Sequence, residues 1–337
     1  MPKNRVNKIY SRIIGIIFVS FVIINFIPTS YNLIEPGIAL ELSSVIEVEE
    51  GYENQGEFLL TAVSSRRAVV WDYLYVSLAS PEDKALESIA AQMPEDMDMN
   101  EYIDVMAKLM EESKLQAQAV AFRKLGYNVS VSGEGAEVVE VMKDGSAYNN
   151  LKKDDLITAI DGQEVEMAAD AVNIIRDREI GDQVQLEVLR DGETLTFNLK
   201  TVELEGNEGN PSIGVLISSK GLEYDIPREV NFDTENIVGP SAGSMFTMEI
   251  YNQLTPDDIT GGKRIAGTGT VNLDGKVGQI GGVKFKVMAA EEAGADLFIV
   301  PAENYEQAQE VQANIPLLEV ENIDDIIDYF TAEEKAA

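Results

Sequence analysis

The hydrophobic pattern first singles out an apolar run near the start of the chain. Residues 13–27 are almost wholly apolar, and Tyr10 and Tyr31 flank them. The stretch is just long enough to span a bilayer, with aromatic residues at the interface levels. Four basic residues precede it: Lys3, Arg5, Lys8 and Arg12. The positive-inside rule then predicts a cytoplasmic N-terminus at residues 1–9, a transmembrane anchor at 10–31 and an extracellular remainder.

Two other interpretations of this run are weaker. A cleaved signal peptide would need small residues around a cleavage site, but Pro28, Thr29 and Ser30 follow the run. A buried core helix is disfavoured because the run has a basic flank and no polar face. We therefore expect a single-pass protein of the cell membrane.

Residues 32–129 form a mixed region with few long patterns. Short apolar runs at 58–63 and 69–71 predict strands. Residues 81–125 predict a long helix, because Ile103, Met106 and Met110 fall near one face, and Gly126 is a suitable C-cap. We treat residues 32–129 as an extracellular N-terminal and helical region.

A compact unit is predicted over residues 130–202. A strand at 136–142 comes first, a helix follows at about 167–178, and two alternating strands follow at 183–189 and 194–199. These two alternating strands are joined by a turn at Asp191-Gly192, and Asp-Gly between alternating strands is a strong hairpin signal.

Composition removes several classes of function. The formal charge is −33, from 26 basic and 59 acidic residues, which argues against nucleic acid as a partner. The chain has no cysteine and no histidine, so disulfides, thiol nucleophiles, Ser-His-Asp triads and nearly every zinc site are excluded. We expect no metal and no cofactor, and a hydrolase built from this chain needs Lys, Asp, Glu or Tyr as its base.

One serine stands in a setting that suits a nucleophile. Ser241 lies in the run Gly239-Pro240-Ser241-Ala242-Gly243, ahead of an apolar helical stretch. Glycines admit a substrate backbone, and amide groups at a helix start can stabilise an oxyanion. Gly239, Pro240 and Ala242 would then form the nucleophile loop. The same run also fits an ordinary turn with an N-cap serine.

One lysine stands where its pKa would fall. Lys284 follows Gly281-Gly282 at the start of an alanine-rich helix. Partial desolvation and the positive helix end both disfavour the ammonium form. We therefore assign Lys284 as the candidate base, and we expect Lys286 to be an ordinary solvated lysine. A solvated surface position is the alternative for Lys284 too.

Residues 130–202 resemble a bacterial PDZ domain. The matching segments are Leu151–Gln163 and the hairpin, although Asp154 replaces a usual glycine and Tyr148 departs from the usual turn. The resemblance implies a domain that binds an extended peptide by strand addition and holds a C-terminal carboxylate on backbone amides. A small sandwich that only positions its neighbour is the alternative.

Residues 203–334 resemble the proteolytic domain of the Lon proteases. The motifs are Gly-Pro-Ser-Ala-Gly around Ser241, Thr268-Gly269 ahead of a turn, Gly-Gly-x-Lys ending at Lys284, and a later Pro-x-Glu-Asn at 301–304. The resemblance implies a Ser-Lys dyad of Ser241 and Lys284, with Thr268 orienting the lysine. Val238 and Phe285 stand where many relatives carry acidic residues.

The ATPase of the Lon proteases has no counterpart in these patterns. The nearest approach to a phosphate-binding loop, residues 269–277, has one residue too many and ends in Val277 rather than Ser or Thr. The chain as a whole resembles the PDZ-Lon proteases anchored outside Gram-positive bacteria.

Together these patterns predict an α+β multidomain protein. It would combine an N-terminal transmembrane helix, a PDZ-like β-sandwich or barrel with helices, and an α/β Lon-type proteolytic domain. We predict a nucleotide-independent serine endopeptidase that acts on peptide or protein substrates, and an oligomer is compatible with the sequence. The alternatives are a catalytically silent PDZ scaffold and a Ser-Lys amidase, although no serine here has a lysine three residues later.

Overall fold

The computed structural model describes most of the chain. It covers residues 12–16, 18–19, 22–89, 97, 99–204, 207, 209–234 and 237–336.

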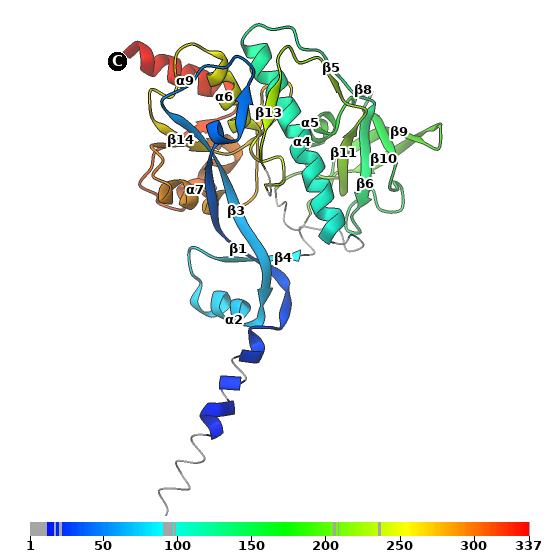
Figure 1. Cartoon of the computed structure of the whole chain (residues 1–337). Helices are drawn as coiled ribbons and strands as arrows, with labels where there is room; N and C mark the ends of the chain where they lie inside the picture. Colours follow the sequence, from blue (N-terminus) through cyan, green and yellow to red (C-terminus); the bar gives the residue numbers. More distant parts are fainter. Residues whose placement is uncertain are drawn as a thin grey trace, which may run out of the picture.

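A six-stranded sheet forms the centre of the larger lobe (Figure 1), in the order β18-β17-β14-β3-β1-β4. Strands β3, β14, β17 and β18 run parallel, whereas β1 and β4 add antiparallel strands at one edge. The strands are β1 (Pro28–Glu41), β3 (Glu57–Val69), β4 (Ala85–Ser88), β14 (Arg264–Gly267), β17 (Leu297–Pro301) and β18 (Leu317–Val320).

Helices cover both faces of this sheet, and successive side chains of strand β3 pack against helices on opposite faces. Phe58 and Leu60 pack in one core with residues of α6 (Gly243–Leu254), whereas Leu59 packs in a second core with residues of α7 (Val283–Glu292). All three side chains are buried, as expected for a strand with helices on both sides.

The N-terminal region belongs to the same sheet as the last third of the chain. Phe58 of β3 lies opposite Ile265 of β14, about two hundred positions away in the sequence. Figure 1 shows the blue β3 running alongside β14. The predicted boundaries between residues 32–129 and 203–334 therefore separate strands that pair directly with each other.

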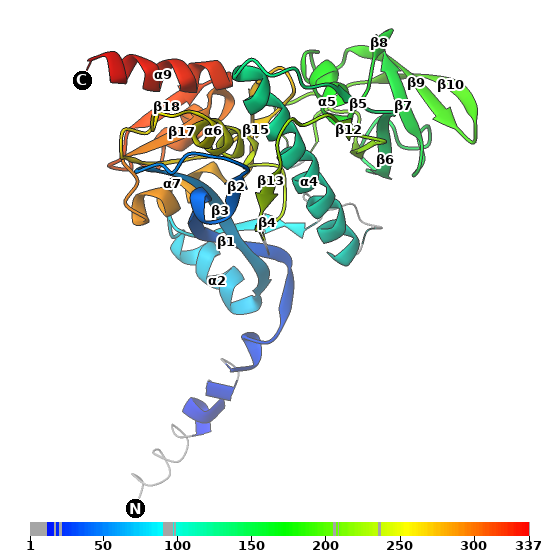
Figure 2. The ribbon, with the colours of Figure 1, turned by 45° about the horizontal axis from the view of Figure 1, so that its top comes forward.

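A second lobe is inserted between these two parts of the sheet (Figure 2). Its strands follow the order β10-β9-β7-β6-β11 around a separate apolar core. The two ends of the insertion meet where β5 (Val131–Ser132) pairs with β12 (Glu223–Tyr224). Its elements are β6 (Gly135–Val141), β7 (Leu156–Ile160), β8 (Gln163–Glu164), α5 (Ala168–Arg176), β9 (Gln183–Arg190), β10 (Glu193–Lys200) and β11 (Val215–Lys220).

Most predicted elements of the insertion are present. The helix at 167–178 is α5, and the hairpin is β9–β10, with positive φ of 51° at Asp191 and 84° at Gly192. Asp154 adopts φ 71°, so it takes the left-handed position for which glycine is usual. Edge strand β11 follows the predicted end at residue 202 and pairs with β6 in the same sheet.

The long helix is shorter than predicted. Of the range 81–125, residues 85–88 form β4, residues 90–96 and 98 lie outside the described residues, and α4 spans Met99–Lys124. The strand predicted at 69–71 is wrong, because α2 (Val70–Ala79) begins there.

The remaining elements are short or terminal. They are η1 (Leu42–Ser44), β2 (Ile46–Val48), β13 (Val230–Phe232), β15 (Thr270–Val271), β16 (Val277–Gly278), η2 (Ala302–Asn304), α8 (Tyr305–Gln309) and α9 (Ile323–Ala336).

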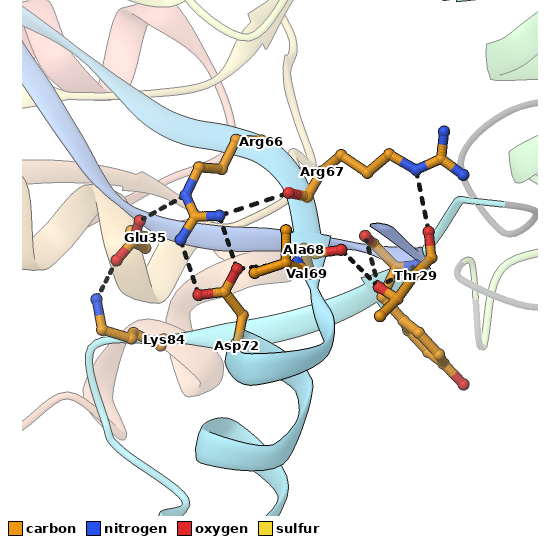
Figure 3. Close-up of polar contacts among 9 residues, drawn as sticks. Thr29, Glu35, Arg66, Arg67, Ala68, Val69, Asp72 and Lys84 are labelled. Atoms are coloured by element: carbon orange, nitrogen blue, oxygen red, sulfur yellow. Dashed lines mark hydrogen bonds and ion pairs between the residues drawn. The ribbon is translucent and has the colours of Figure 1, made fainter. Parts of the chain in front are cut away.

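A polar cluster fixes α2 to the end of the β1–β3 ribbon (Figure 3). Arg66 donates to both oxygens of Asp72, at 2.7 and 2.9 Å, and Glu35 pairs with Lys84 beside them. Asp72 also accepts the N–H of Val69 at 3.0 Å, which satisfies a donor at the start of the helix. These contacts orient a helix that has no buried residue of its own.

The predicted transmembrane anchor at 10–31 is contradicted. Among the residues that the structure describes, no helix is both long enough and apolar enough to cross a membrane. Pro28 instead begins β1, and residues 1–11, 17, 20 and 21 lie outside the described range. The single-pass localisation predicted from this anchor, with a cytoplasmic N-terminus and an extracellular catalytic domain, is therefore not supported.

The continuous sheet makes a prediction about fragments. Residues 203–334 alone would lack β3 and β1, and β14 would lose its partner along one side. We expect this fragment to show no cooperative thermal unfolding by circular dichroism, whereas residues 28–336 should unfold in a sharp transition. A sharp transition of the short fragment would contradict the shared sheet.

Candidate active site

Ser241 lies in a loop that α4 holds against the start of α6. Gly239 has a positive φ of 95° and donates its N–H to the carbonyl of Met106 at 3.1 Å. The Ser113 hydroxyl of α4 donates to the carbonyl of Pro240 at 3.2 Å. Because α4 forms hydrogen bonds with the two residues just before Ser241, the position of the serine depends on the N-terminal part of the chain.

The side chain that contacts Ser241 is that of Lys286. Its Nζ lies 2.7 Å from the Ser241 Oγ and 3.0 Å from the Thr268 Oγ1. Lys286 is only 3% exposed, and among the described residues no acidic side chain forms an ion pair with it. Burial without a counter-charge lowers the pKa of Lys286 from its ordinary 10.5 to about 8.

Lys284, the lysine assigned from the sequence, does not reach Ser241. Its ammonium pairs with Glu310, and its side chain is 40% exposed. Residues two apart on a helix point in different directions, so α7 cannot turn both lysines toward the serine. The expectation that Lys284 faces Ser241 and Lys286 is solvated is therefore corrected: the two positions are the reverse.

A pattern in the sequence could have identified Lys286. The apolar stripe of α7 consists of Val283, Val287 and Ala290, all buried. Lys286 completes the spacing i, i+3, i+4, i+7 and is thus the one charged residue on that stripe. Proximity to the double glycine and to the helix end favoured Lys284, but the facing of the helix decides burial.

Thr268 lies just after β14, at the carboxyl ends of the parallel strands, where ligand sites of such sheets gather. Its hydroxyl donates to the Ser241 carbonyl at 2.9 Å. A hydroxyl has one proton, so towards Lys286 the Thr268 oxygen must accept. When Lys286 is neutral, one of its N–H groups then faces Thr268 and its lone pair is free to face Ser241.

The backbone around Ser241 is fixed on one side and open on the other. Its carbonyl accepts a second hydrogen bond, from the Gly269 N–H at 2.9 Å. The N–H groups of Ser241 and Ala242 have no backbone partner among the described residues, and α6 begins with Gly243 directly after them. These two donors and the helix dipole can stabilise a negative oxygen near the serine.

A second buried titratable group lies farther along α6. Burial raises the pKa of Glu249 to about 7, although the hydrogen bond from Gln253, at 2.6 Å, opposes the rise. Glu249 is two turns from the nucleophile and contacts none of the three site residues in the described contacts. Within the part of the chain that the structure describes, no group of three or more His, Cys, Asp or Glu residues could hold a metal ion.

Family models match two parts of the chain. Residues 235–332 match the Lon protease (S16) C-terminal proteolytic domain, and residues 123–201 match a PDZ domain. The first match includes Ser241, Thr268 and Lys286, and the second covers most of the inserted lobe.

Curated relatives agree with the first match. A Lon protease of Wolbachia pipientis subsp. Culex pipiens is 40% identical over 93 residues, which cover 26% of this chain and 11% of that protein. A Lon protease of Metamycoplasma arthritidis is 37% identical over 144 residues, which cover 41% of this chain and 15% of that protein. The chain thus spans only a small part of the length of these relatives.

A solved structure is similar to about a quarter of the chain. The PDZ domain of an SdrC-like protein from Listeria monocytogenes is 26% identical, covers 26% of this chain and 92% of its own, and has a TM-score of 0.25. The two family models thus support a PDZ domain at residues 123–201 and a Lon-type C-terminal proteolytic domain at residues 235–332. The prediction of a serine peptidase is confirmed at the level of that domain.

Proposed function

We propose that the chain is an ATP-independent serine endopeptidase in which Lys286 is the general base for Ser241. The observation that carries the proposal is the 2.7 Å contact between Ser241 Oγ and the Nζ of Lys286, a lysine that is only 3% exposed. A lysine base must be neutral near working pH, and desolvation supplies this without a second cation.

The reaction would proceed through an acyl-enzyme. Neutral Lys286 takes the proton of the Ser241 hydroxyl while Oγ attacks the peptide carbonyl carbon. The resulting ammonium then gives that proton to the leaving amine. Water attacks the ester in the second half, again losing its proton to Lys286, and Ser241 regains its proton as the acid product leaves. The N–H groups of Ser241 and Ala242 stabilise the two oxyanions.

Independence from ATP rests on the form of the nearest phosphate-loop candidate. A phosphate-binding loop joins a strand to a helix. Residues 270–278 instead form the antiparallel hairpin of β15 and β16. Without an unfolding motor, the substrates would be peptides or loosely folded segments, and the PDZ domain would recruit them.

Replacing each of the two lysines in turn by glutamine tests which of them is the base. Lys286→Gln should lower kcat about 10²- to 10⁴-fold, the usual contribution of a positioned base. Lys284→Gln is the matched control, and we expect at least half of the activity to remain because its ammonium faces Glu310. Peptide hydrolysis followed by mass spectrometry measures both. If Lys284→Gln lost activity and Lys286→Gln kept it, Lys284 rather than Lys286 would be the base. If no active-site serine reagent labelled Ser241, the catalytically silent scaffold would be favoured.

The lowered pKa of Lys286 sets the pH dependence. Only the neutral amine can take the serine proton, so kcat/KM should rise with pH and reach half of its plateau at about pH 8. A profile already flat above pH 6 would contradict a lysine base.

Thr268 is proposed as a positioning residue. Thr268→Val removes one hydrogen bond and should lower kcat about tenfold, since such a bond contributes roughly 1–1.5 kcal/mol. Its oxygen stabilises the ammonium more than the amine, so the midpoint of the pH profile should move below that of the wild type. Thr268→Ser should restore both rate and midpoint, whereas an unchanged midpoint in Thr268→Val would indicate a purely structural role.

A further inference from the structure

Helix α4 lies between the two lobes and contacts both of them (Figure 1). Glu112 accepts two hydrogen bonds from Ser219 of the PDZ domain, from its N–H at 2.9 Å and from its hydroxyl at 2.7 Å. The next residue, Ser113, donates to the carbonyl of Pro240 in the nucleophile loop at 3.2 Å. Both residues of α4 line a cavity of about 310 Å³ that the helix shares with the PDZ domain. Neighbouring positions of one helix therefore connect the PDZ domain to the active site.

The carbonyl of Pro240 belongs to the same peptide unit as one of the two oxyanion donors. A trans peptide unit is planar, so its C=O and its N–H point in opposite directions. The carbonyl of Pro240 and the N–H of Ser241 form one such unit, and the carbonyl of Ser241 and the N–H of Ala242 form the next. The contacts that hold these two carbonyls therefore also set the directions of the two N–H groups.

Different side chains hold the two units. The carbonyl of Ser241 accepts two hydrogen bonds at 2.9 Å, one of them from the hydroxyl of Thr268. The carbonyl of Pro240 accepts from Ser113, and its other described partner, the N–H of Gly243, lies at the longer distance of 3.4 Å. Within the described contacts, Ser113 is thus the one side chain that fixes the unit carrying the Ser241 N–H.

The space around the Ser113 hydroxyl is narrow. A Cβ built on Gly243, the first residue of α6, would lie 2.9 Å from the Ser113 Oγ and 3.0 Å from the backbone nitrogen of Val271. A side chain at position 243 would therefore push the loop away from α4, and glycine permits the close approach. Because Ser113 is only 3% exposed, its hydroxyl is enclosed between α4 and the start of α6.

Ser113 and Thr268 differ in what else they contact. The Thr268 oxygen lies 3.0 Å from the Lys286 Nζ, so a change at Thr268 also alters the surroundings of the base. The described contacts of the Ser113 hydroxyl include neither the Ser241 Oγ nor the Lys286 amine. Ser113 can therefore act on the oxyanion without acting on the base.

We propose that Ser113 is a positioning residue for the oxyanion hole. Its hydroxyl holds the Pro240–Ser241 peptide unit so that the Ser241 N–H faces the substrate oxygen on which negative charge develops. The proposal rests on the proposed peptidase function and adds to that site a residue from a helix that precedes the PDZ domain. Because Glu112 anchors the same turn of α4 on Ser219, the PDZ domain contributes to holding this hydroxyl in place.

Ser113→Ala removes the hydrogen bond and leaves the dyad in place. We expect kcat for the best-cleaved member of a randomised decapeptide pool to fall about tenfold, the usual effect of one hydrogen bond, with KM unchanged. The midpoint of the pH profile should stay at that of the wild type, because Lys286 keeps its contacts.

Ser244→Ala is the matched control. Ser244 is fully buried in the first turn of α6, and its hydroxyl has no hydrogen-bond partner among the residues that the structure describes. Its replacement removes a buried hydroxyl beside the same loop without removing a hydrogen bond, so kcat should equal that of the wild type. Thermal unfolding followed by circular dichroism checks that both variants are folded.

A peptide aldehyde of the same sequence separates the oxyanion from ground-state binding. The Ser241 Oγ bonds to the aldehyde carbon, the π pair of the C=O bond moves to the oxygen, and that oxygen takes the proton of the serine hydroxyl and occupies the oxyanion site. The inhibition constant should rise in Ser113→Ala by a factor similar to the fall in kcat. The intact peptide should bind equally to Ser241→Ala and to the double variant with Ser113→Ala, as measured by fluorescence anisotropy.

The outcomes separate this role from the dyad. A wild-type kcat in Ser113→Ala, or a loss of affinity for the intact peptide equal to the loss in rate, would overturn the role of Ser113 and leave the dyad intact. A shifted pH midpoint with an unchanged inhibition constant would connect Ser113 with the base and would overturn the proposal too. Persistent cleavage by Ser241→Ala would instead overturn the peptidase assignment itself.

Discussion

The burial of one ammonium group without a counter-ion is the constraint on which the active site depends. Lys286 is 3% exposed and contacts two hydroxyls rather than a carboxylate. An acidic partner would stabilise the charged form and raise the pKa, which would abolish the base; a solvated position would leave the pKa near 10.5. The hydroxyl of Thr268 accepts from the amine because its proton goes to the Ser241 carbonyl. Burial without an acidic partner outweighs this contact and favours the neutral amine that the proposed reaction needs.

Three distant parts of the sequence build this environment. The strand β3 separates the core beneath α6 from the core beneath α7. The N-terminal region therefore supports α6, which begins just after Ser241, and α7, which carries Lys286. Helix α4 then holds the nucleophile loop through Ser113 and lines the cavity shared with the PDZ domain. Insertion of the PDZ domain directly after α4 places its edge strand beside Pro240. The helix that holds the nucleophile loop therefore also forms a wall of this cavity.

The sequence predicted well where the signal was local. The β9–β10 hairpin followed from Asp191-Gly192, and the helix predicted at about 167–178 is α5. The roles of Ser241 and Thr268, which rest on short motifs, stay predictions. Pairing between β3 and β14 was not predictable, because no local pattern reports a partner about two hundred residues away. The lysine differs from the prediction for another reason: Lys284 stands closer to the two glycines, but α7 turns Lys286 toward Ser241 and Lys284 toward Glu310. The apolar run at 13–27 suggested an anchor that no described helix supports.

Direct titration of the Lys286 amine tests the central claim most closely. Lysines labelled with ¹³C at Cε can be followed by NMR across pH in the full chain, and Lys286→Gln assigns the signal by its loss. The account predicts a midpoint for Lys286 at about pH 8, well below that of Lys284 in the same sample. A midpoint near the ordinary 10.5 would contradict it, because the amine would then be charged at neutral pH and unable to act as the base.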